Sequence, residues 1–277
     1  MGIFWETIPV SLQKWILEQH LFFVASAPLS NTGHINVSSK GGKYFGLIDE
    51  RTFWYHDLSG SGIETISHLH ESGNGRICIM FNAFDGPPKI VRLWGHGRVL
   101  ENGTKEFSDF IEKHNVNIIP GTRSIIIVDV HQVGSSCGFS VPYYDFKDYR
   151  PILNDFMEKK QKKFLAGEEK ESMDRYWAYK NAWSIDGLPG MKRALDASKT
   201  HGVAPIKKMV GPLAPKNGTI HSDGFTLEQV MIIFIIAFVA GVMAATLSPN
   251  VLKNAIVALR NQAEGRQAAW LPKSLRS

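Results

Sequence analysis

One long run without charged side chains lies near the C-terminal end of this 277-residue chain and limits what the chain can fold into. It extends from Gln229 to Leu252, and the stretch from Val230 to Leu247 is almost wholly apolar. The core of a bilayer needs about 20 such residues in helical form, so this segment is long enough to cross a membrane. We therefore expect a transmembrane helix over residues 225–248. A buried core helix or a dimerising helix is the alternative.

The charge of the chain is unevenly distributed along its length. Residues 225–277 carry five Lys or Arg and two Asp or Glu, whereas residues 1–224 carry 26 and 24. The long N-terminal part is therefore nearly neutral, and we expect no nucleic-acid partner, because such a domain would present a basic patch.

The orientation in the membrane is predicted by two arguments that disagree. The basic tail, residues 249–277, favours a cytosolic C-terminus. A tail-anchored chain whose N-terminus has no signal-peptide pattern instead keeps its N-terminal domain in the cytosol. We prefer the second orientation, that of a single-pass, tail-anchored protein with a cytosolic N-terminal domain.

Residues 20–135 have the pattern of an antiparallel sheet. Short runs of β-branched and aromatic residues alternate with Gly, Pro and Asn turn signals. The expected strands are residues 21–27, 34–38, 52–56, 76–82, 89–101 and 124–133. With helices expected over 5–19, 61–72 and 104–114, the fold class is α+β, and the apolar strands favour closure of the sheet into a barrel.

The segment Ser59-Gly60-Ser61-Gly62 precedes an expected helix and is a candidate phosphate site. The first N–H groups of a helix lack internal partners and carry partial positive charge. The two serine hydroxyls add donors, and the glycines allow close approach. The alternative is a plain capping box, in which Ser61 caps the helix and Glu64 reaches back to it.

Two further strands carry polar or aromatic side chains that a ligand could contact. Alternation places Asn36, Ser38 and Lys40 on one face of their strand, which is otherwise the solvent-facing edge of a hairpin. Arg92 and Trp94 alternate with apolar neighbours, and Arg92 can reach a phosphate. The alternative for this pair is a cross-strand contact on a half-buried sheet.

Metal and nucleophile motifs are missing from the sequence. The ten histidines and two cysteines show no spacing typical of a zinc site, so we expect no metal. There is also no Gly-x-Ser-x-Gly elbow and no Cys–His pattern. We therefore name no catalytic acid, base or nucleophile.

Several segments in the same order resemble the pyridoxamine 5′-phosphate oxidase-like, FMN-binding split barrels. They are LFFVASAPLSNTGHINVSSKG, TFWYHDLSGSGIETISHL and RICIMF…IVRLWGHGRVLE. The later segments SSCGFSVPYYDF and YWAYKNAWSIDGLPG resemble a fungal-type branch of that superfamily. The resemblance implies a six-stranded antiparallel split barrel over residues 1–195, a homodimer, and FMN at the dimer interface. Residues 196–224, rich in Gly, Pro and Lys, would then be a linker.

The resemblance also assigns roles to the candidate residues. It implies that Asn36, Ser38 and Lys40 line the flavin, with Lys40 supplying positive charge. It places Trp94 near the flavin ring, and Tyr55 at a strand end where family members contact the cofactor. True pyridoxamine phosphate oxidases carry a Ser-Arg-Lys run where this chain has Ser59-Gly60-Ser61-Gly62.

These observations lead to two functional hypotheses. The first is an FMN-dependent oxidoreductase of unassigned substrate, dimeric and anchored to a membrane. The second is a non-enzymatic flavin- or haem-binding module that serves as a sensor, carrier or scaffold at a membrane.

Overall fold

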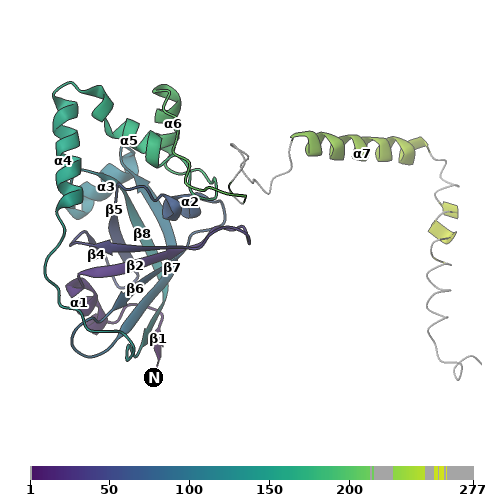
Figure 1. Ribbon diagram of the computed structural model, residues 1–277. Helices are drawn as coiled ribbons and strands as arrows, with labels where there is room; N and C mark the ends of the chain where they lie inside the picture. Colours follow the sequence, from purple (N-terminus) through teal and green to yellow (C-terminus); the bar gives the residue numbers. More distant parts are fainter. Residues whose placement is uncertain are drawn as a thin grey trace, which may run out of the picture. The chain divides into compact units, whose positions relative to one another are not determined.

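The computed structural model describes residues 2–212, 214, 227–246, 253–254, 256–258 and 260. The chain divides into two compact units, Met1–Ile220 and His221–Ser277. All the strands of the described residues belong to the first unit, which also holds six of their α-helices (Figure 1).

The sheet of the first unit is antiparallel throughout. Its strands are β1 (Ile3–Trp5), β2 (Leu21–Ser26), β3 (Asn36–Gly41), β4 (Phe45–Leu47), β5 (Thr52–Leu58), β6 (Arg76–Asn82), β7 (Ile90–Glu101) and β8 (Thr122–Ser136). They are ordered β3-β2-β6-β7-β8-β5-β4, and β1 pairs with the far end of β8. The sheet is therefore a half-barrel that runs from β3 to β4. The expected antiparallel architecture with peripheral helices is confirmed, but the sheet has eight strands where six were expected.

The helices lie around this half-barrel. They are α1 (Val10–Glu18), α2 (Glu64–His70), α3 (Lys105–His114), α4 (Ile152–Leu165), α5 (Met173–Lys180) and α6 (Lys192–Thr200). Helix α1 lies at one end of the sheet, and α4, α5 and α6 lie together at the other (Figure 1). Helix α6 continues past residue 195, where the sequence places the end of the domain.

The core fills the concave side of the sheet with aromatic rings. Phe22, Phe53 and Phe81 are almost fully buried and contact one another edge-on or tilted at 5.5–6.0 Å between centroids. Alternation of apolar residues in each strand directs these side chains to one face, which is the physical basis of the sequence prediction.

The second unit contains α7 (Leu227–Thr246). Among the described residues, no helix is long and apolar enough to cross a membrane. The transmembrane helix expected over residues 225–248 is thus not found, and positions 225, 226, 247 and 248 lie outside the described residues. Membrane attachment and its orientation stay predictions from the sequence.

Candidate functional site

A small polar pocket lies where the inner face of β3 meets the loop between β5 and α2. It has a volume of about 160 Å³, and its lining residues are Asn36, Ser38, Lys40, Leu58, Gly60, Gly62, Glu64, Thr65 and Arg123. Along β3, Asn36, Ser38 and Lys40 are half-buried while the residues between them are exposed. The predicted shared face is therefore confirmed. Its polar side chains turn inward, whereas the apolar Val37 on the opposite face of the strand is 64% exposed.

Hydrogen bonds order the polar side chains on β3. The Asn36 amide donates to Thr65 Oγ1 at 3.0 Å, and the Ser38 hydroxyl donates to Asn36 Oδ1 at 3.3 Å. Antiparallel pairing with β2 fixes the register of the strand, since Ser38 lies opposite Val24 and Lys40 opposite Phe22. One wall of the pocket is therefore made of ordered hydroxyl and amide groups.

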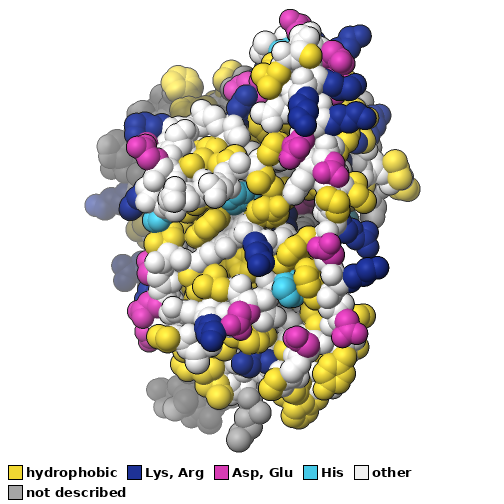
Figure 2. Space-filling view, turned by 90° about the vertical axis from the view of Figure 1, so that its left-hand side faces the viewer, with side chains coloured by type: hydrophobic (Ala, Val, Ile, Leu, Met, Phe, Trp, Pro, Cys, Tyr) yellow, Lys and Arg dark blue, Asp and Glu magenta, His cyan; other side chains and the backbone are white. Residues whose placement is uncertain are grey.

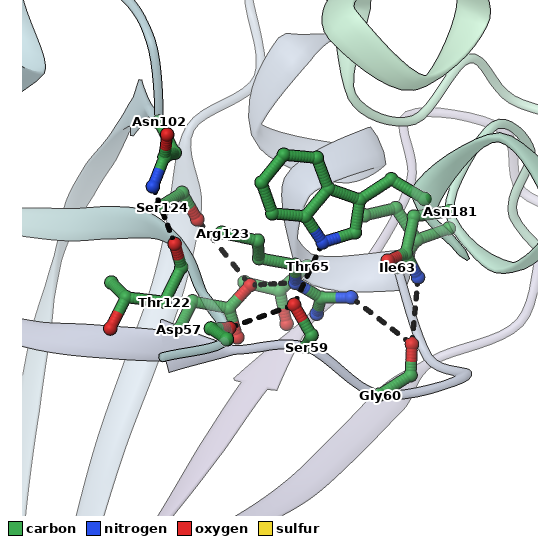
Figure 3. A network of polar contacts seen from close by, with 12 residues as sticks. Asp57, Ser59, Gly60, Ile63, Thr65, Asn102, Thr122, Arg123, Ser124 and Asn181 are labelled. Atoms are coloured by element: carbon green, nitrogen blue, oxygen red, sulfur yellow. Dashed lines mark hydrogen bonds and ion pairs between the residues drawn. The ribbon is translucent and has the colours of Figure 1, made fainter. Parts of the chain in front are cut away.

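Two cations share one buried carboxylate beside the pocket. Asp57 Oδ1 accepts a hydrogen bond from Lys40 Nζ at 2.9 Å. Asp57 Oδ2 accepts one from Arg123 Nε at 2.7 Å (Figure 3). Burial alone would raise the pKa of Asp57, but the Arg123 guanidinium and the Lys40 ammonium outweigh it and lower the pKa to about 2. Asp57 is therefore ionised, and the three groups together carry one net positive charge.

The loop that closes the pocket is held in place by α5. Ser59 Oγ donates to the carbonyl of Gly121 at 2.7 Å and accepts from Trp177 Nε1 at 2.8 Å. The Asn181 amide donates to the carbonyl of Gly60 at 2.8 Å (Figure 3). The hydroxyl of Ser59 is thus engaged within the protein, and the loop is fixed before any ligand arrives.

The helix after this loop begins later than the sequence predicts. Helix α2 starts at Glu64, and its N-cap is Ile63 rather than Ser61, which is exposed. Glu64 Oε2 accepts from the N–H of Ile63 at 2.8 Å, so the carboxylate itself satisfies the helix start. The predicted capping role of Ser61 is wrong, because the helix begins three residues after it, at Glu64.

Three of the residues predicted to bind the cofactor, Tyr55, Arg92 and Trp94, do not line this pocket in a single chain. Tyr55 is fully buried in the core, with Lys40 Nζ 5.7 Å from the centre of its ring. Trp94 stacks on Phe4 at 6.5 Å between centroids and lines a separate groove on the sheet. Arg92 reaches Ser136 Oγ at 3.5 Å. The structure brings together the β3 residues and Gly62, but not Arg92 and Trp94.

Arg123 is the functional candidate that sequence reasoning missed. It precedes the β-branched run of β8, and its side chain is only 5% exposed. A buried Arg at a strand entrance needs a carboxylate partner. The apolar run after Arg123 indicates that this arginine is buried. The sequence does not show that its carboxylate partner is Asp57 on β5.

A larger cavity of about 860 Å³ adjoins the pocket and shares Lys40, Leu58 and Gly60 with it. His56 also lines this cavity, and burial lowers its pKa to about 4, so its imidazole is neutral at physiological pH. The site is therefore a small cationic pocket that opens onto a larger cavity.

Comparison with known proteins places the chain in a family. No family model matches it. The pyridoxamine 5′-phosphate oxidase family protein ustO of Aspergillus flavus is 38% identical over 209 residues, which are 70% of this chain and 80% of that protein.

Solved structures give weaker matches. HupZ of Group A Streptococcus is 19% identical, with a TM-score of 0.34 over 46% of this chain and 92% of that chain. The FAD-binding protein of Mycobacterium smegmatis is 15% identical, with a TM-score of 0.31 over 48% of this chain and 97% of that chain. Scores this low do not by themselves establish a common fold. The match to ustO does establish the family, and the chain belongs to the pyridoxamine 5′-phosphate oxidase family.

Proposed function

We propose that this protein binds a flavin, with FMN as the preferred one. The phosphate of the flavin would lie in the pocket between β3 and the β5–α2 loop. We further propose that it acts as a flavin-dependent oxidoreductase. The observation that carries the proposal is the charge of the pocket, where Lys40 and Arg123 share the single carboxylate of Asp57.

The residues of the pocket fit a phosphate group. Charge-assisted hydrogen bonds from Lys and Arg to phosphate oxygens are roughly twice as strong as hydrogen bonds between neutral groups. The Lys40 side chain is 21% exposed, so its ammonium can turn toward a ligand while Arg123 keeps Asp57 neutralised. The nearby carboxylate of Glu64 is paired with Lys208 Nζ at 3.4 Å, which limits its repulsion of an anion.

A bound flavin would supply the redox chemistry, and the chain would supply binding, orientation and exclusion of water. The hydroxyl and amide groups of Asn36 and Ser38 would orient the ligand along β3. A homodimer is part of the proposal, because Arg92 and Trp94 lie outside the pocket of one chain. They could complete a flavin site only if a second copy brings them to it.

The experiment compares FMN with riboflavin, which lacks the phosphate, by fluorescence titration of the purified full-length chain. Lys40→Met should weaken FMN binding roughly 10- to 100-fold, the value of one charge-assisted hydrogen bond, and leave riboflavin binding unchanged. Lys40→Arg should retain most of the affinity. Lys43→Met is the matched control, since Lys43 is exposed in the connection between β3 and β4 and lines neither pocket.

Wild-type protein that binds neither FMN nor FAD would refute the proposal. The non-enzymatic alternative is separated from it by reducing the bound flavin and following its reoxidation with candidate substrates present. A flavin that binds but never turns over, or a haem spectrum in place of a flavin spectrum, would favour the binding module.

A further inference from the structure

The larger cavity is closed on one side by a segment without helix or strand, residues 137–151, which we call the strap. The strap connects β8 to α4 along the side of the molecule that faces the viewer in Figure 2. It is attached to the sheet region, since the N–H of Tyr144 donates to the carbonyl of Phe84 at 3.0 Å and their rings lie 5.4 Å apart. It is therefore a fixed wall of the cavity.

Aromatic rings from the strap and from the sheet line the cavity. On the strap side, Phe146 stacks on His20 with 3.7 Å between ring centroids, and Tyr149 OH lies 2.9 Å from His20 Nδ1. On the sheet side, Tyr44 stacks on His56 at 5.8 Å. Phe146 is 48% exposed despite its contact with His20, so part of its ring stays available to a flat aromatic ligand.

The polar groups of the cavity are mostly uncharged. The Asn154 amide donates to Tyr44 OH at 2.9 Å, which leaves the amide oxygen as a further acceptor. Three charged side chains line the cavity: Asp148 and Arg150 are exposed and of opposite sign, and Lys40 is paired with Asp57 behind the wall. Neutral rings and hydroxyls therefore outnumber the groups that would select a charged ligand.

We propose that this cavity binds an uncharged hydroxy-aromatic ring, a phenol, between the strap and the β4–β5 hairpin. The phenol ring would lie against Phe146 and Tyr149, and its hydroxyl would exchange hydrogen bonds with Asn154 and Tyr44. Its role as the substrate of the neighbouring flavin rests on the proposed function, whereas its binding does not require flavin.

The test uses the full-length chain and p-cresol as the probe, with binding followed by saturation-transfer NMR. A ligand of this size should bind with a Kd on the order of 1 mM. Phe146→Ala should lower the p-cresol signal at least several-fold, because it removes the ring against which the ligand stacks. Tyr143→Ala is the matched control: Tyr143 is 80% exposed on the same strap and does not line the cavity.

A second probe tests the selectivity for uncharged rings. The carboxylate p-toluate has the size of p-cresol and should give the weaker signal. Equal p-cresol signals from wild type and Phe146→Ala, stronger binding of p-toluate, or no binding of p-cresol would each overturn the inference. If FMN binds and p-cresol does not, only this inference fails; if p-cresol binds and no flavin does, the proposed function fails.

Discussion

Replacement of Asp57 by Asn is the sharpest test of the polar network beneath the pocket. The Asp57 side chain is 1% exposed and that of Arg123 5%, so the amide would leave a buried guanidinium without its counter-charge. Removing one partner of a buried ion pair costs about 3–5 kcal/mol. That is a large fraction of the roughly 5–15 kcal/mol by which a native domain is stable.

The assay is thermal unfolding at pH 7 by circular dichroism. For a domain of this size each kcal/mol lowers Tm by about 2–4 °C, so Asp57→Asn should lower Tm by roughly 6–20 °C. Asp129→Asn is the matched control, because Asp129 is 59% exposed and lies 3.8 Å from Arg98 on the surface. It should change stability by less than about 1 kcal/mol.

The same carboxylate makes stability depend on pH. The pKa of Asp57 is about 2 in the folded protein against an ordinary value of 3.8. The folded state therefore favours the ionised form, and this contribution is fully present above pH 3.8 and is lost as the pH falls through about 2. It amounts to about 2 kcal/mol. Asp57→Asn should lose this part of the acid dependence.

A double variant, Asp57→Asn with Arg123→Met, separates a buried charge from general loss of packing. Removing both charges should recover part of the stability, since the unpaired guanidinium is gone and the remaining cation, Lys40, is 21% exposed and can be hydrated. The single variant Arg123→Met completes the comparison. If Asp57→Asn and Asp129→Asn lower Tm equally, or if the double variant loses as much stability as Asp57→Asn and Arg123→Met added together, the ion-pair argument is wrong.

Three other substitutions test different parts of the fold. Trp177→Phe removes the donor to Ser59 and should weaken FMN binding about fivefold, the value of about 1 kcal/mol, with riboflavin binding unchanged in the same titration. Phe53→Ala should cost about 3–5 kcal/mol in urea unfolding, because the ring is fully buried among aromatic neighbours. Gly190→Ala should destabilise the protein in the same assay, since its methyl group would collide with neighbouring backbone oxygens, whereas Gly60→Ala meets nothing within 4 Å and should not.

The main strands could be predicted from the sequence because their local patterns are strong. All six expected strands overlap observed ones, since β-branched runs and turn residues act over short distances. The strands β1 and β4 have three residues each, too few to show an alternation. Their pairing depends on β8 and β5 and is therefore a tertiary property.

The site was predictable only in part. The shared face of Asn36, Ser38 and Lys40 follows from alternation alone. The ion pairs of Asp57 join residues on three different strands, which no local pattern relates. Tyr55 lies in the core as alternation with Phe53 requires, and the pattern fails only at His56, which is buried next to Asp57 and the bulge between Asp57 and Leu58.

The position of β8 has a consequence for biosynthesis. This strand pairs with β5, β7 and the N-terminal β1, and Ile3 lies opposite Ser135. A ribosome that adds about 5–20 residues per second needs roughly 7–27 s to reach the end of β8. During that time the nascent β5 and β7 expose unpaired apolar edges, so the emerging polypeptide should be a client of chaperones that shield such edges until translation has passed Ser136.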